Sequence, residues 1–399
     1  MKKIVISFLG KARKDTGGKY RSLCYRFADG QKVTTRFFGL SLAQQLRPDL
    51  FILLGTCGSM WDVLFDGVGD GDEMEEDRLA LMEEVEVNSV SQGCLDRLAP
   101  LLERQLGMAC RSLIIPFGRD VGEQMEILAT MAEEVAAGDT VSMDLTHGFR
   151  HLPMLGFLSA MFLKEVKRAR VEGLYYGAAD MQEDGEAPVV ALDGLLNLAD
   201  WIGALGRYDQ GGDYGVFAPL LRREREAVSQ IDLLEEAAFF ERVGNSSLAR
   251  KKLDTFHEYF SQEPSGGYSP AVRLFRKPLE ARLSWRRREP QWAREGMLAR
   301  QYLQRGDFLR AVIFGYESHV TRRIMEEKLG DAGNYEVRKG AGDDLRTRFP
   351  MFEELAKLRN ALAHGIRPSQ QEVDVALASR SVLERKLNKI FKELGIGGE

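Results

Sequence analysis

Residues 140–148, TVSMDLTHG, hold a short apolar run that ends in aspartate, threonine, histidine and glycine. The length of the run is typical of a β-strand, and its nearly continuous apolar character is typical of a strand covered on both faces. Runs of the same kind occur at residues 3–10, 50–56, 111–118 and 171–178. Together they predict the strands of one buried sheet.

Helical patterns separate these runs, as in residues 41–48 and 123–138. Strands that alternate with helices predict a parallel, doubly wound sheet of the Rossmann-like kind. Residues 25–38 interrupt the alternation, and Asp29-Gly30 predicts the turn of a β-hairpin there. The first half of the chain is therefore predicted to be an α/β domain.

From about residue 218 onward only helical spacing remains. The stretch GRYDQGGDYG, residues 206–215, is rich in glycine and aspartate and predicts a joint between two domains. We expect an α/β domain at 1–205, a linker at 206–217 and an all-α domain at 218–399. A chain of 399 residues is too long for one ordinary core, which agrees with two domains.

Composition narrows the class of protein. The net charge of −5 argues against a surface covered with the positive charge that non-specific nucleic-acid binding requires. The sequence contains no apolar run of about 18 residues, so we expect no membrane span, and its first residues do not fit a signal peptide. The chain has four cysteines, Cys24, Cys57, Cys94 and Cys110, and no two of them are as close in sequence as zinc ligands usually are. So few thiols in a chain of this length indicate a reducing, cytoplasmic setting. We expect no metal site and no cofactor.

Ligands of open parallel sheets bind beyond the carboxyl ends of the strands, so the residues after each run are the candidates for a site. After residue 144, Thr146 can cap the next helix and leave the amides of Gly148 and Phe149 free, with Arg150 adding a positive charge. This arrangement suits an anion such as phosphate. Gly and Thr also make ordinary tight turns, which is the alternative for any single loop.

A second small-residue loop follows residue 54, in LGTCGSMWD, residues 54–62. Its glycines let a ligand approach the backbone closely. No G-x-G-x-x-G motif follows any predicted strand, which argues against a nicotinamide dehydrogenase.

In the helical half, Pro350 and Gly365 predict the two ends of a helix. Its apolar stripe is expected to contain Phe352, Leu355, Leu358, Leu362 and Ala363. Arg359 falls inside this stripe, while Asn360 and His364 share the adjoining face. An arginine on an apolar stripe needs a partner, either an ordinary core carboxylate such as Glu317 or a site between two copies of the chain.

The motif RNALAH, residues 359–364, resembles the Arg-x4–6-His motif of HEPN ribonucleases. DLTHGFRHLP, residues 144–153, together with residues 54–62 and 175–180, resembles the D-x-THG branch of the CARF sensor domains in type III CRISPR ancillary ribonucleases. The resemblance covers essentially the whole chain, with CARF followed by HEPN. It implies a CARF dimer that binds a cyclic oligoadenylate, and a HEPN dimer that then cleaves single-stranded RNA in antiviral defence without a metal.

The resemblance implies two sets of site residues. The catalytic set is Arg359, Asn360 and His364. The residues expected to contact the cyclic oligoadenylate are Gly10, Lys11, Thr56, Cys57, Gly58, Ser59, Met60, Thr146, His147, Gly148, Phe149 and Arg150. The four-membered adenylate ring is favoured and the six-membered ring is the alternative, since a two-fold pocket suits an even-numbered ring.

The residue types fit RNA cleavage by the neighbouring 2′-hydroxyl, which leaves a 2′,3′-cyclic phosphate. His364 suits proton transfer and Arg359 suits stabilisation of the added phosphate charge, while Asn360 can hold the histidine or the RNA.

We expect a homodimer or a higher even oligomer, without stable binding to the CRISPR effector complex. The alternative function is a nucleotide-sensing regulator with an inactive helical dimer domain. The Arg- and Trp-rich run at 284–294 is either an RNA path or a solvated helix face.

Overall fold

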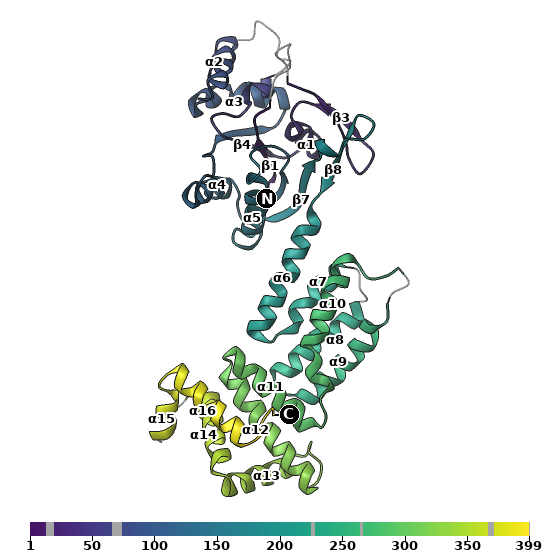
Figure 1. Cartoon of the computed structure of the whole chain (residues 1–399), viewed down its shortest axis with the longest axis vertical. Helices are drawn as coiled ribbons and strands as arrows, with labels where there is room; N and C mark the ends of the chain where they lie inside the picture. Colours follow the sequence, from purple (N-terminus) through teal and green to yellow (C-terminus); the bar gives the residue numbers. More distant parts are fainter. Residues whose placement is uncertain (13–19, 66–73, 225–227, 264–265, 366–370, 399) are drawn as a thin grey trace. The chain divides into compact units, whose positions relative to one another are not determined.

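The computed structural model describes the whole chain except residues 13–19, 66–73, 225–227, 264–265, 366–370 and 399. Its contacts divide the chain into two compact units, Met1–Leu196 and Asn197–Glu399. In Figure 1 the first unit runs from purple to teal and the second from teal to yellow. The first unit contains the sheet and the second is helical, which confirms the predicted α/β domain followed by an all-α domain.

The described residues of the first unit form one sheet with the strand order β3-β2-β8-β7-β6-β1-β4-β5. The strands are β1 (Lys3–Leu9), β2 (Leu23–Arg26), β3 (Lys32–Thr35), β4 (Leu50–Gly55), β5 (Ala109–Ile114), β6 (Thr140–Asp144), β7 (Arg170–Gly177) and β8 (Glu186–Ala191). All neighbours from β7 to β5 are parallel, as predicted. The predicted hairpin is the antiparallel pair β2 and β3.

Helices cover both faces of this sheet. The helices of this unit are α1 (Phe38–Leu46), η1 (Trp61–Phe65), α2 (Glu75–Glu86), α3 (Gln92–Leu106), α4 (Val121–Glu133), α5 (Leu152–Glu165) and η2 (Ala179–Met181). Strand β1 shows why the strands are apolar throughout. Ile4, Ile6 and Phe8 pack into the core that contains residues of α4 and α5, whereas Val5 and Leu9 pack into the core that contains residues of α1 and α3. Successive side chains point to opposite faces, so both faces need apolar residues.

The predicted linker at 206–217 is not a loop. Helix α6 (Asp193–Gly211) continues through its first part, and η3 (Tyr214–Phe217) forms its last part. Tyr208, Tyr214 and Phe217 are buried in the core of the second unit. The glycines and aspartates suggested a joint, but the aromatic residues between them bury enough apolar surface to hold this stretch in a helix and a turn. The division between the two units lies inside α6, between Leu196 and Asn197.

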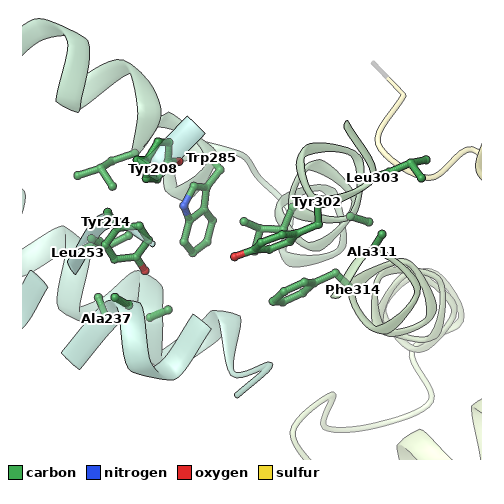
Figure 2. Close-up of a cluster of buried hydrophobic side chains, with 14 of the residues drawn as sticks. Tyr208, Tyr214, Ala237, Leu253, Trp285, Tyr302, Leu303, Ala311 and Phe314 are labelled. Atoms are coloured by element: carbon green, nitrogen blue, oxygen red, sulfur yellow. The ribbon is translucent and has the colours of Figure 1, made fainter. Parts of the chain in front are cut away.

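The described part of the second unit continues with α7 (Ala218–Arg223), α8 (Val228–Arg242), α9 (Ser246–Ser261), α10 (Pro270–Arg282), η4 (Ser284–Arg287), α11 (Gln291–Arg305), α12 (Phe308–Glu327), α13 (Tyr335–Arg348), α14 (Pro350–His364), α15 (Gln371–Leu377) and α16 (Arg380–Glu393). Figure 2 shows a cluster of buried rings in its core, with Tyr208, Tyr214, Trp285 and Tyr302 among them. Among the described residues, no helix is both long and apolar enough to cross a membrane.

Candidate functional site

A cavity of about 370 Å³ opens beyond the carboxyl ends of β1, β4 and β6. It is lined by Leu9, Gly10, Lys11, Thr56, Gly58, Ser59, Asn88, Phe117, Gly148, Phe149 and Leu152. Its volume is within the range of small-molecule sites, and its position is where doubly wound sheets bind ligands. Among the residues predicted to contact a ligand, those that line the cavity are Gly10, Lys11, Thr56, Gly58, Ser59, Gly148 and Phe149.

Two glycines bring the loops after β1 and β6 into contact. A Cβ on Gly10 would lie 2.6 Å from the backbone nitrogen of Gly148, which is closer than real Cβ contacts come. Gly148 itself has a φ of 108°, in the region that favours glycine. Gly10 and Gly148, which both line the cavity, therefore meet at a backbone contact that a side chain on Gly10 would obstruct.

The loop after β4 is a tight turn held by buried hydroxyls. Ser59 Oγ donates to the carbonyl of Leu9 at 2.7 Å and accepts from the amide of Thr56 at 2.9 Å. The buried Met60 donates its amide to the carbonyl of Gly10 at 2.9 Å. The half-buried Cys57 accepts from the amide of Val90 at 3.0 Å, also through its backbone. Ser59, Met60 and Cys57 thus fix the shape of the turn, and neither Cys57 nor Met60 lines the cavity.

The helix after β6 begins later than predicted, and Thr146 does not cap it. Helix α5 starts at Leu152, and Thr146 Oγ1 instead accepts from the amide of Gly177 at 2.7 Å. A helix starting at Thr146 would place Pro153 in its interior, where the proline ring clashes with the carbonyl of Phe149. Gly148 and Phe149 therefore lie in a loop ahead of the helix rather than in its first turn.

His147 and Arg150 also lie outside the cavity lining. The half-buried His147 accepts from the amide of Phe38 through Nε2 at 3.3 Å, and its ring lies 5.2 Å from that of Phe37. Burial lowers the pKa of His147, which favours the neutral ring that this acceptor role requires. Arg150 is exposed to solvent.

Asp144, the first residue of the D-x-THG stretch, is fully buried. Its carboxylate accepts from Ser7 Oγ at 2.6 Å and from the amide of Thr146 at 2.8 Å. Burial raises the pKa of Asp144, against the effect of these hydrogen bonds and of His147. Asp144 thus anchors the loop after β6 to strand β1, a role that we did not predict for it.

Four residues that line the cavity were not among the predicted contacts: Leu9, Asn88, Phe117 and Leu152. Phe117 follows β5, so the rule about strand ends could have found it. Asn88 follows helix α2, where no sequence pattern points to the site, and its Oδ1 accepts from Lys11 Nζ.

Two aromatic side chains, Phe117 and Phe149, line the cavity. The ring of Phe149, which is 48% exposed, stacks on His151 with centroids 5.9 Å apart and planes at 15°. Phe117 lies 5.9 Å from Phe149, and its carbonyl oxygen lies 2.9 Å from His151 Nε2. The exposed ring of Phe149 suits stacking with a planar, apolar group, and Lys11 adds a positive charge to the lining of the same cavity.

In the second unit, Arg359 lies half-buried on α14. Its guanidinium carbon lies 4.4 Å from the ring centroid of Tyr316. Asn360 Oδ1 accepts from Arg359 Nε at 3.2 Å and from Nη2 at 3.0 Å. The alternative partner Glu317 was wrong, because Glu317 forms its ion pair with Arg338.

The helix around Arg359 has the predicted ends, with Gly365 in the left-handed conformation after His364. Phe352, Leu355 and Leu358 are buried as predicted and Leu362 is partly buried, whereas Ala363 is exposed. Ala356 and Ala361 are buried instead. His364 is the last residue of the helix and is exposed.

The run at 284–294 is partly buried, whereas its Arg287 and Arg288 are exposed. Trp285 is buried, and only 7% of Arg286 and 5% of Arg294 is exposed. Their guanidinium groups pair with Asp254 and Glu289, each at 2.7 Å. These arginines stabilise the fold of the second unit.

Among the residues that the structure describes, no group of three or more His, Cys, Asp or Glu side chains is placed to hold a metal ion. The four cysteines carry free thiols. The two candidate sites thus offer lysine, arginine, histidine, aromatic rings and backbone groups as their chemistry.

Comparison with known proteins identifies the first unit. Residues 4–180 match the family model of the CARF domain of the CRISPR system endoribonuclease Csx1. The chain is also 27% identical over 254 residues to the CRISPR-associated protein MJ1674 of Methanocaldococcus jannaschii. This match covers 58% of the chain and 40% of the length of that relative. Residues 4–180 thus match a CARF domain of the Csx1 kind, and the chain is similar over 254 residues to a CRISPR-associated protein.

Proposed function

We propose that this protein is an endoribonuclease that a cyclic oligoadenylate activates and that cleaves single-stranded RNA in type III CRISPR defence. The observation that carries the proposal is the arrangement on α14, where Arg359 and Asn360 precede an exposed His364 at the helix end. This arrangement lies in the second unit of a chain whose first unit is a CARF domain. A helical domain that served only for dimerisation would not need this set of residues.

The cavity in the CARF domain supports a nucleotide as the activator. Lys11 and the backbone of Gly10, Gly58 and Gly148 suit phosphate, and Phe149 offers a ring on which adenine can stack. A cavity of about 370 Å³ is near the lower end of the range of ligand sites, so one copy holds only part of a ring. Two copies related by a two-fold axis would enclose a ring of four adenylates, and a ring of six is the alternative.

The chemistry of α14 supports metal-independent cleavage. The 2′-oxygen of a ribose attacks the neighbouring phosphorus, the bond from phosphorus to the 5′-oxygen breaks, and a 2′,3′-cyclic phosphate forms. One imidazole accepts the proton of the 2′-hydroxyl, and the 5′-oxygen leaves with a proton from an acid. Arg359 stabilises the charge that gathers on the phosphate oxygens.

One copy of α14 does not complete this site. Arg359 and His364 are five residues apart, which places them about 140° apart around the helix axis. Both residues meet at one phosphate only if a second copy of α14 supplies the other half. The proposal therefore includes a dimer with a shared catalytic site.

The test is RNA cleavage by the full chain with no activator, with the four- and six-membered cyclic adenylates, and with linear oligoadenylate. We expect one ring to raise the cleavage rate by orders of magnitude and the linear form to have little effect. A protein that binds a ring but never cleaves RNA would be the nucleotide-sensing regulator. Equal cleavage under all conditions would contradict activation.

A further inference from the structure

The guanidinium of Arg359 is held from two sides. Its carbon lies 4.4 Å from the ring centroid of Tyr316 on α12. The side-chain oxygen of Asn360 accepts two of its hydrogen bonds, at 3.2 and 3.0 Å. A planar cation with one face on a ring and one edge on a shared acceptor has little rotational freedom left.

Tyr316 is itself fixed in place. Its ring stacks on Phe352 of α14, with centroids 4.8 Å apart and planes at 28°. On the other side, a Cβ on Gly342 of α13 would lie 2.5 Å from the hydroxyl of Tyr316. The tyrosine thus occupies space that exists only because residue 342 is glycine. Burial raises the pKa of Tyr316, so the ring that faces Arg359 is the neutral phenol.

We propose that Tyr316 and Asn360 are positioning residues, which aim the guanidinium of Arg359 at the phosphate, and that Gly342 makes room for Tyr316. This inference rests on the proposed function of Arg359. A guanidinium carries five N–H donors, of which Asn360 engages two, so three remain for phosphate oxygens. Asn360 therefore orients the arginine, a role different from holding the histidine or the RNA.

The experiment compares cleavage by variants of the full chain in the presence of activator. Tyr316→Leu removes the ring, and we expect kcat to fall about tenfold to hundredfold, because a misplaced catalytic group costs about that much. Tyr316→Phe keeps the ring and is expected to restore most of the rate. Asn360→Ala is expected to lower kcat as well, with KM for RNA nearly unchanged in each case.

His319 supplies the matched control. It lies on the same helix and packs against the same Phe352, with centroids 5.3 Å apart, but its ring contacts are with Phe352 and Phe349. His319→Leu tests whether any change in this packing lowers the rate. We expect the kcat of His319→Leu to be close to that of the unmodified protein. Thermal unfolding and activator affinity are measured for every variant, so that variants that fold poorly are identified.

A second arm shows whether the effect passes through Arg359. In an Arg359→Lys background the forked donors are gone, so Tyr316→Leu and Asn360→Ala should lose most of their effect on kcat. The same fold-change in both backgrounds would overturn the positioning role.

Full kcat in Tyr316→Leu and Asn360→Ala would also overturn it, provided that Arg359→Ala is inactive. Full activity in Arg359→Ala would instead reject the proposed catalytic site. If Tyr316→Leu does not fold, Asn360→Ala, which replaces a half-buried helical side chain by a strong helix former, carries the test.

Discussion

Gly10 and Gly148 approach so closely that a single Cβ on Gly10 would lie 2.6 Å from the backbone nitrogen of Gly148. The contact joins the loops that follow β1 and β6, and both residues line the cavity of the CARF domain. The geometry of the candidate ligand site thus depends on two residues that contribute no side chain. This dependence makes the site sensitive to a very small substitution.

Gly10→Ala is expected to weaken binding of the cyclic oligoadenylate by about tenfold or more, because the added methyl group forces the two loops apart. The measurement is activator affinity by calorimetry. Gly194→Ala is the control, because nothing lies within 4 Å of a Cβ at that position. Unchanged affinity in Gly10→Ala would show that the loop contact is not part of the binding site.

Phe149→Ala is expected to weaken activator binding by about tenfold to a hundredfold, since stacking of a base on an aromatic ring contributes about 1–3 kcal/mol. Arg150→Ala should have a smaller effect, because Arg150 is exposed and lies outside the cavity lining. Both affinities are measured against the same adenylate ring. A larger loss in Arg150→Ala would indicate that the activator binds outside the cavity.

His364→Ala is expected to lower RNA cleavage by about 10²- to 10⁴-fold, the usual contribution of a general acid or base. Arg359→Ala should cost about 10²- to 10³-fold through loss of charge stabilisation. Fold and activator affinity should remain nearly unchanged in both variants. Cleavage by the unmodified protein should continue in the presence of a metal chelator. The products should end in 2′,3′-cyclic phosphates, which mass spectrometry identifies. A strict need for magnesium would contradict this mechanism.

Mixed dimers test the shared site directly. In a dimer of an Arg359→Ala copy and a His364→Ala copy, the first copy keeps His364 and the second keeps Arg359. These two residues form one complete pair across the dimer interface. The mixed dimer should therefore regain part of the activity that each variant dimer lacks. Co-expression with two different affinity tags isolates the mixed species. No recovery would mean that each copy needs its own Arg359 and His364. A monomer in sedimentation, with and without activator, would remove the basis for a shared site.

The stability of the second unit is expected to depend on pH through Glu241. Burial raises the pKa of this carboxyl from its ordinary value of 4.5 to about 7, against the effect of its hydrogen bond from Tyr302 and of the nearby Arg305 and Arg310. Between these two values the unfolded chain loses the proton while the folded chain keeps it. The free energy of unfolding therefore falls as pH rises from about 4.5 to about 7, by roughly 3 kcal/mol, and then levels off.

Glu241→Gln should remove this part of the pH dependence, because the amide does not ionise. Urea unfolding at several pH values, followed by helical circular dichroism, measures it. A wild-type curve that rises over the same range, or that the substitution leaves unaltered, would show that another group controls the stability.

Local patterns in the sequence predicted the central strands and the ends of α14. The apolar runs at 3–10, 50–56 and 140–148 match β1, β4 and β6, because burial on both faces of a sheet requires continuous apolar residues. Pro350 and Gly365 define the ends of α14 through their own backbone preferences. These features depend on residues close together in the chain.

The same local signals misplaced features that depend on distant residues. Thr146 looked like a helix cap, but its hydroxyl accepts from Gly177, and α5 begins only at Leu152 because of Pro153. Residues 206–217 looked like a linker, but aromatic side chains within them pack into the core of the second unit. At Thr146 a nearby proline and a hydrogen bond to a distant residue outweighed the capping preference, and at 206–217 core packing outweighed the glycines and aspartates.

Local patterns along the chain were enough to predict which loops gather at the carboxyl edge of the sheet and which helix carries Arg359, Asn360 and His364. The packing of distant elements brings Asn88 into the cavity and places Arg359 on Tyr316 while Glu317 pairs with Arg338. Periodicity encodes the face on which a residue lies, because that depends on its own helix or strand. The partner that a side chain meets depends on how several elements pack, and residues far apart in the chain determine that packing together.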